Sequence, residues 1–224
     1  MKIQLLILLI FLTKLSVSQV KQAILKKEYI SDNYSLYYSI DESKVLNGNY
    51  YVNDAKNALV LKGNYSNGLR NGLWLLFNND GSLKMSFNSS SNKLIFLIPN
   101  FFSNIGYSFS EEKMKDFRLA LPLFSFDLLF DLLSQNKAFK SLDRESAKEL
   151  SLVASINENG KATFTINKND NILIDNLEIE NNKFFDLDWI PAFNSNRNTS
   201  IRLIFPLNIT PDSDAERQRF RWNY

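Results

Sequence analysis

Alternating apolar and polar positions run through residues 29–98 and predict a series of short, half-buried β-strands. The clearest stretch is residues 34–40, Tyr-Ser-Leu-Tyr-Tyr-Ser-Ile, in which large apolar side chains recur at every second position. A period of two places successive side chains on opposite faces of a strand. Five of the seven glycines lie between positions 48 and 81, and this clustering indicates tight turns between the strands.

Within this region the sequence repeats itself. Val-Leu-Asn-Gly-Asn-Tyr at 45–50 recurs as Val-Leu-Lys-Gly-Asn-Tyr at 60–65, the similarity continues from 53–59 into 67–73, and a degenerate third copy covers 83–94. Each unit is interpreted as strand, turn, strand. A hairpin this short cannot bury its own apolar face, so the units are expected to pack on one another.

Three dipeptides in the repeat region are predicted to form turns: Asn67–Gly68, Asn71–Gly72 and Asp80–Gly81. Asn, Asp and Gly tolerate the positive φ that tight hairpin turns demand. Each dipeptide is therefore expected to join two neighbouring strands.

The stretch from Gly63 to Lys84 combines three short motifs, Gly-x-Tyr, Asn-Gly and Leu-Trp. Through these motifs residues 44–97 resemble the MORN-variant repeat of toxin–antitoxin-like MORN proteins. The first copy departs from the pattern at Ala58, where the repeat has glycine, and the third copy has lost its glycines. The resemblance implies packed β-hairpins and interaction with a protein or a surface, and it implies no shared catalytic residues.

Residues 108–150 change to a helical pattern and are predicted to form a connector or a layer packed on the sheets. Ser108 with Glu111 fits a capping box, and Pro122 suits the first turn of a helix. The segment that follows Pro122 is apolar almost all round, which indicates burial. The predicted helices run from Ser108 toward 121, over 123–133 and near 143–150.

Strand-like patterns return over residues 151–210, which are predicted to form a small α+β domain. Glu-Asn-Gly at 158–160 suits a hairpin turn. Strands are expected at 152–156, 162–166 and 201–205.

That hairpin, the Trp-Ile-Pro-Ala run at 189–192 and the closing Phe-Pro at 205–206 together resemble the C-terminal domain of TonB energy transducers. Residues 176–188 are too short and Asn-rich for the helix that this family has before its Trp. No Pro-rich span or uncleaved anchor is recognised either. The resemblance therefore implies a βαβ-like envelope domain and argues against energy transduction.

The predicted fold class is α+β, mostly β, with packed hairpin repeats, a helical connector and a small C-terminal α+β domain. The chain is divided into a signal peptide (1–18), a β-hairpin repeat domain (19–107), a helical connector (108–150), a C-terminal TonB-C-like domain (151–210) and a charged tail (211–224).

The first residues have the pattern of a secretory signal. Lys2 precedes an apolar run over 3–12, and Ser16 and Ser18 put small residues where a signal peptidase cleaves, before Gln19. A run of about ten apolar residues is half the length of a membrane span. Cleavage is therefore expected, and the mature protein is predicted to be periplasmic or extracellular, without stable membrane insertion.

The mature chain is predicted to be electrically neutral. Loss of Lys2 and Lys14 lowers the count of Lys and Arg from 26 to 24, which equals the 24 Asp and Glu residues. A neutral chain has no overall field to attract nucleic acid. A basic and aromatic tail is therefore expected to dock on the domain or to be disordered; it comprises Arg217, Arg219, Phe220, Arg221, Trp222 and Tyr224.

Cysteine and histidine are both absent. Disulfides, thiol nucleophiles, imidazole bases and the usual zinc ligands are therefore excluded. Asp127 and Asp131, four apart on one helical face, and Asp186 with Asp188 beside Trp189 are the candidate carboxylate pairs. We expect the first pair to be the solvent edge of a buried helix and the second to form a turn.

These patterns favour an exported, non-catalytic protein-interaction or scaffold module of the bacterial cell envelope, with another envelope protein as its partner. One alternative is a carbohydrate- or cell-wall-binding module that uses exposed Trp74 or Trp189. Another is a carboxylate-based hydrolase, which needs two carboxyls roughly 5 to 9.5 Å apart. No catalytic residue, metal or cofactor is predicted. The candidate binding residues are Tyr50, Tyr65, Trp74, Phe77 and Trp189. Large aromatic residues in a small β domain can also belong to its core.

Overall fold

The computed structural model confirms the predicted fold class, with a mostly β chain and short helices. It describes residues 24–103, 105–109, 116–140, 149–169, 172–179, 183–194 and 197–207. The predicted signal peptide, the charged tail, the core of the predicted first helix and most of the predicted third helix lie outside these residues.

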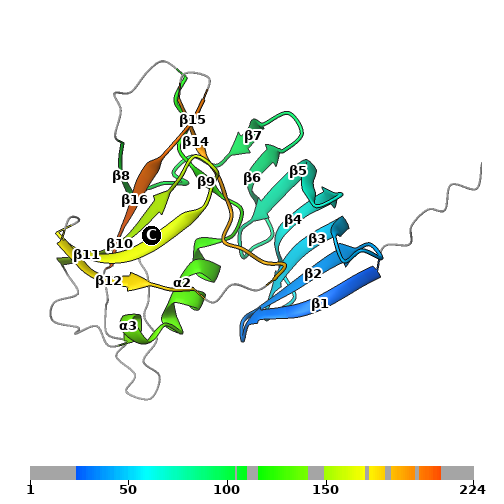
Figure 1. Cartoon of the computed structure of the whole chain (residues 1–224), viewed down its shortest axis with the longest axis horizontal. Coiled ribbons are helices and arrows are strands. Elements are labelled where there is room, and N and C mark those ends of the chain that lie inside the picture. The colour runs from blue at the N-terminus through cyan, green and yellow to red at the C-terminus, as the bar shows by residue number, and fades with distance from the viewer. Residues whose placement is uncertain are drawn as a thin grey trace, which may run out of the picture.

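The repeat region forms one antiparallel sheet whose seven strands follow chain order (Figure 1). Its hairpins are joined edge to edge by hydrogen bonds, so each strand from β2 to β6 pairs with both the one before it and the one after it. This arrangement gives the short hairpins the shared apolar face that each lacks alone. The strands are β1 (Ile24–Ser31), β2 (Tyr34–Ile40), β3 (Leu46–Asp54), β4 (Leu59–Ser66), β5 (Leu69–Phe77), β6 (Leu83–Asn88) and β7 (Lys93–Leu97).

Two of the three predicted turns are confirmed, and the third is wrong. Asn67 and Gly68 have φ of 50° and 78° between β4 and β5, and Gly81 has φ of 81° between β5 and β6. Gly72 also has a positive φ, 65°, but it lies inside β5. The pairing of β4 with β5 shifts register there, so the glycine serves a bulge, where an extra residue needs the same backbone freedom as a turn.

The second large sheet contains five strands in the order β12-β11-β10-β16-β8. The predicted hairpin at Glu158–Gly160 joins β10 to β11, and Gly160 has φ of 78°. Residues 106–108 belong to this sheet, since they pair with β16. Ser108 therefore ends a strand, and the prediction that it begins a helix is wrong. Its strands are β8 (Gly106–Ser108), β10 (Leu150–Ile156), β11 (Ala162–Lys168), β12 (Ile172–Leu177) and β16 (Ile201–Pro206).

Two short ribbons tie the middle of the chain to its end. In the first, β9 (Leu121–Pro122) pairs with β13 (Trp189–Ile190). In the second, β14 (Ala192–Asn194) pairs with β15 (Arg197–Thr199), and Arg118 forms a bridge with Phe193.

The buried helix expected at 123–133 is confirmed with different ends, as α2 (Phe126–Ser134). Pro122 is in β9 instead of the first helical turn, because pairing with Trp189 holds it extended. Ser125 then caps the helix, its hydroxyl accepting a hydrogen bond from the Leu128 amide at 3.1 Å. A further short helix, α3 (Lys137–Lys140), follows, and Leu150 starts a strand instead of ending a helix.

Both large sheets contribute to one hydrophobic core, with α2 lying between them (Figure 1). Phe126 of α2 contacts Phe101 on one side and Phe205 of β16 on the other, at ring-centroid distances of 5.7 and 5.3 Å. The repeat sheet therefore does not stand alone, since its inner face is buried against the rest of the chain. Within the described residues no helix has the length and apolar composition needed to cross a bilayer.

Candidate functional site

Three of the predicted binding residues meet on the inner face of the repeat sheet. Tyr50 of β3, Tyr65 of β4 and Trp74 of β5 lie with ring centroids 5.2 to 5.6 Å apart. Adjacent strands put these side chains on one face because each occupies an inward position of its strand. Trp74 is 1% exposed and Tyr50 is 5% exposed, so the three rings form an aromatic wall whose accessible surface belongs mainly to half-buried Tyr65.

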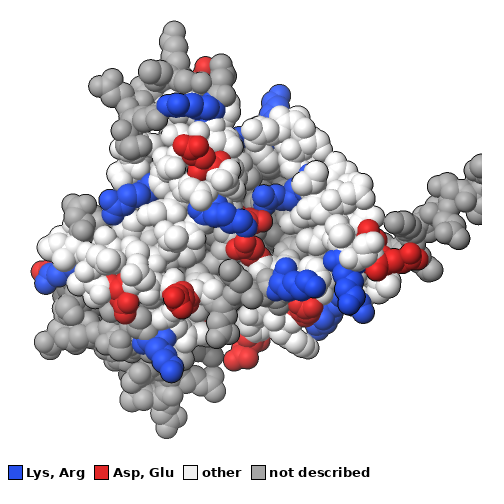
Figure 2. Space-filling view, viewed as in Figure 1, with Lys and Arg blue, Asp and Glu red and all other residues white. Residues whose placement is uncertain are grey.

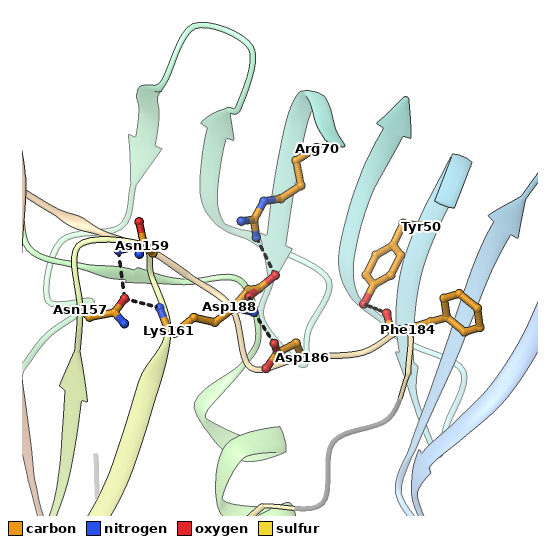
Figure 3. A network of polar contacts seen from close by, with 8 residues as sticks. All are labelled: Tyr50, Arg70, Asn157, Asn159, Lys161, Phe184, Asp186 and Asp188. Atoms are coloured by element: carbon orange, nitrogen blue, oxygen red, sulfur yellow. Dashed lines mark hydrogen bonds and ion pairs between the residues drawn. The ribbon is translucent and has the colours of Figure 1, made fainter. Parts of the chain in front are cut away.

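The segment from Lys183 to Pro191 runs across this aromatic wall. Phe184 stacks on Tyr38 with ring centroids 4.6 Å apart. The Tyr50 hydroxyl donates a hydrogen bond to the Phe184 carbonyl oxygen at 3.2 Å (Figure 3). The two contacts hold a segment from near the end of the chain against the second and third strands.

Asp188 links the two sheets electrostatically. One carboxylate oxygen is 3.0 Å from Arg70 Nη1 of β5, and the other is 2.8 Å from Lys161 Nζ, beside the β10–β11 hairpin. Lys161 also pairs with Asp186, so two cations face two carboxylates (Figure 3). Figure 2 shows basic and acidic side chains meeting between the two halves of the molecule.

Local geometry positions Lys161 for these pairs. The Asn157 side-chain oxygen accepts hydrogen bonds from the amides of Asn159 at 2.9 Å and Lys161 at 3.0 Å, which fixes the turn. Partial burial acts to lower the pKa of Lys161, but its hydrogen bonds to Asp186 and Asp188 outweigh burial and raise that pKa. The ammonium therefore stays charged over the physiological range.

A cleft of about 830 Å³ lies between the aromatic wall and this segment. Leu69, at the start of β5, lines it and is 74% exposed. The lining comes from both parts of the chain and comprises Leu46, Tyr50, Tyr65, Gly68, Leu69, Arg70, Phe87, Ser89, Asn92, Lys183, Phe184, Phe185, Asp186, Asp188, Trp189, Ile190 and Pro191.

The cleft is equipped for binding more than for proton transfer. Both carboxylates among its lining residues are paired with cations. Burial, the largest cause in each case, raises the pKa of Tyr65 to about 12 and that of Tyr50 well above its usual value. Both phenols are therefore neutral hydrogen-bonding groups at physiological pH.

The two other predicted binding residues have different environments. Trp189 also lines the cleft but is 0% exposed, and its ring packs edge-on against Phe124 at 5.1 Å. Phe77 is half-buried at the end of β5 and is not among the lining residues. Since Trp74 and Trp189 are both buried, the idea that either offers an exposed ring to a sugar is wrong. Bulky indoles fill the shared core instead.

Asp127 and Asp131 lie on α2, where they face the first hairpin of the repeat sheet. Asp131 Oδ1 accepts a hydrogen bond from Asn33 Nδ2 at 2.6 Å. Burial first, and then the charge of Asp127, raises the pKa of Tyr34 to about 12. The pair therefore connects the helix to the turn between β1 and β2.

Sequence reasoning missed Arg70 and Lys161 as site residues. Both lie beside turn dipeptides that were recognised, and Asp186 and Asp188 were interpreted as turn-formers. Charges of opposite sign flanking predicted turns are the only local signal of this network. Nothing in the linear pattern indicates that residues 70, 161 and 188 converge.

Comparison with known proteins adds no family or neighbour to this description: no protein-family model matches the chain, and neither the curated proteins nor the solved structures gave a match. The fold and the site thus define the class as a mostly β protein with a cleft between the inner face of its repeat sheet and the segment from Lys183 to Pro191. The MORN-variant and TonB-like resemblances stay predictions.

Proposed function

We propose that this chain is an exported, non-catalytic interaction module of the bacterial envelope that holds a segment of a partner protein in the cleft. The observation that carries the proposal is the character of the cleft walls. Aromatic and aliphatic side chains such as Leu46, Leu69 and Phe184 dominate them, and both lining carboxylates are neutralised by Arg70 and Lys161. Such a cleft suits a chain segment that inserts an apolar side chain.

Exposed Leu69 favours a protein partner. An exposed aliphatic side chain beside aromatic cleft walls forms apolar surface of the kind that marks interaction sites, and a bound protein segment would remove it from water. The carboxylate-based hydrolase is a weaker candidate. Its catalytic carboxyls must contact the substrate, whereas Asp186 and Asp188 already contact Lys161, and Asp188 also contacts Arg70.

Site-specific photo-crosslinking tests this proposal. A photoreactive residue replaces Leu69 in the full chain, expressed in the cells that produce it. The matched control carries the same residue at Leu173, which is 55% exposed on β12, outside the cleft lining. We expect a discrete envelope protein to crosslink from position 69 and not from 173. No product from position 69, or the same products from both positions, would contradict the proposal.

A further inference from the structure

The outer face of the repeat sheet carries an ordered row of basic and aromatic side chains. Lys27 pairs with Tyr37, Tyr37 with Tyr51, and Tyr51 with Lys62, across strands β1 to β4. Directly opposed residues point to the same side of a sheet. The row is therefore continuous, with a lysine at each end. Three strand spacings separate these lysines, about 14 Å.

The row is accessible and self-supporting. The rings of Tyr37 and Tyr51 stack with centroids 4.8 Å apart and an interplanar angle of 7°. Lys27 Nζ lies 5.3 Å from the Tyr37 ring and 4.8 Å from that of Tyr29, which is 71% exposed. Such packing holds the ammonium group in place without an acidic partner.

Asparagines form a second row on the same face. Asn49 pairs with Asn64, and Asn64 with Asn71, and all three are exposed. Each amide carries donors and an acceptor together, the combination that neighbouring sugar hydroxyls match. The Asn71 oxygen already accepts a hydrogen bond from the Ser90 hydroxyl at 2.8 Å, so Asn71 contributes mainly its donors. The outward positions in these two rows contain no Asp or Glu. The face therefore combines positive charge with sugar-compatible hydrogen bonding.

We propose that this outer face binds an acidic polysaccharide, whose carboxylates pair with Lys27 and Lys62 while its hydroxyls contact the asparagine row. Charge complementarity sets the sign of the ligand. Leu25 of β1 is an exposed aliphatic side chain on this face, but the two rows themselves consist of lysines, tyrosines and asparagines. This polar composition favours a polysaccharide over a protein, whose interface cores are apolar. The outer face is opposite the cleft, so the two proposals succeed or fail separately.

Binding of the purified mature chain to polygalacturonate tests the proposal, with neutral dextran and polyglutamate as comparison polymers. We expect binding to polygalacturonate that weakens with added salt, none to dextran, and clearly weaker binding to polyglutamate. Lys27→Gln combined with Lys62→Gln is expected to weaken binding about tenfold, and Lys62→Gln alone about threefold. Asn64→Ala is expected to weaken it further without altering the salt dependence.

Lys26→Gln is the matched control, since Lys26 is also exposed on β1 but pairs with inward-facing Tyr38. It removes one charge from the same strand and should change the affinity for polygalacturonate less than twofold. Circular dichroism checks that every variant is folded. Three results would overturn the proposal: no binding to polygalacturonate, equal binding to polyglutamate, or equal losses from Lys26→Gln and Lys62→Gln. Equal binding to polyglutamate would indicate an acidic protein as the partner.

Discussion

Gly63 lies directly beneath the indole ring of Trp74. A Cβ built on Gly63 would be 2.4 Å from Trp74 Cδ2 and 2.5 Å from Cε2, far inside van der Waals contact. The glycine of the Gly-x-Tyr motif on β4 thus makes room for the tryptophan of the Leu-Trp motif on β5. The same packing places Tyr65 edge-on against Trp74, at 5.3 Å, and so builds the aromatic wall of the cleft.

Gly63→Ala should therefore destabilise the protein. The added methyl group must displace a fully buried ring, and overpacking of this kind costs about 1 to 3 kcal/mol. Urea unfolding measures the change. Gly106→Ala is the control, since its nearest contact is ordinary, 3.4 Å from Ile204 Cβ. If the clash is the cause, Trp74→Leu should make Gly63→Ala nearly neutral in the double variant. Additive losses would refute this explanation.

Gly160→Ala is expected to be more damaging still. Its Cβ would stand 2.0 Å from the Trp189 carbonyl oxygen, and its φ is already positive. Both the clash and the backbone strain oppose alanine, so we expect a loss of about 3 kcal/mol or more. Gly81→Ala has a similar φ but open space around it, so it should cost only about 1 kcal/mol. Thermal unfolding of both variants separates the effect of the clash from that of the backbone strain. Equal losses of stability in the two variants would mean that the clash contributes nothing.

Asp188→Asn should cost more stability than Asp186→Asn. The Asp188 side chain is 23% exposed and joins two cations, whereas Asp186 is more exposed and pairs with Lys161 alone. We expect losses of about 1 to 3 kcal/mol for Asp188→Asn and at most about 1 kcal/mol for Asp186→Asn. Denaturant unfolding at low and high salt measures both. If the two variants have the same free energy of unfolding, the ion pairs that link the sheets contribute little to stability.

Stability should fall in alkaline solution as tyrosines ionise. Burial raises the pKa of Tyr34 and of Tyr65 from the ordinary 10.0 to about 12. Below pH 10 the folded and the unfolded chain both keep these phenol protons, and the two tyrosines contribute fully to the free energy of unfolding. Between about pH 10 and 12 the unfolded chain loses them first, which favours unfolding.

The free energy of unfolding, measured across this pH range, should therefore decline less steeply in the double variant Tyr34→Phe with Tyr65→Phe. Tyr29→Phe, which removes a hydroxyl from a ring that is 71% exposed, is the control for loss of a phenol. An identical decline in the double variant would show that these two phenols do not govern it.

Export predicts a defined N-terminus. If the pattern of residues 1–18 acts as a cleaved signal, the protein recovered from the envelope or the medium should begin at Gln19. N-terminal sequencing and intact mass test this. Ser18→Leu places a bulky side chain at the cleavage position and should leave the precursor uncut, while Thr13→Ser should be processed normally. A full-length protein in the membrane fraction would favour an anchor.

Local signals predicted several elements correctly, and they failed where one residue type suits two structures. The alternation at 34–40 predicted β2 at its observed bounds, and the Asn-Gly and Asp-Gly pairs at 67–68 and 80–81 predicted turns. The same signal misled at Asn71–Gly72, because a bulge and a turn both need positive φ. Pro122 misled similarly, since its fixed φ suits a helix start and an extended strand alike, and pairing with Trp189 decided between them.

The order of apolar and polar residues by itself determined the class of fold, the hairpin units, the buried helix and the chemistry excluded by the lack of Cys and His. These depend on periods of two and 3.6, on turn residues and on composition, all of which are local. Only the tertiary structure decided which aromatics are buried, and that Arg70, Lys161 and Asp188 meet. Arg70 and Asp188 are 118 residues apart in the chain, and Lys161 and Asp188 are 27 residues apart. Their convergence depends on packing, and no periodicity encodes which distant surfaces will share a core.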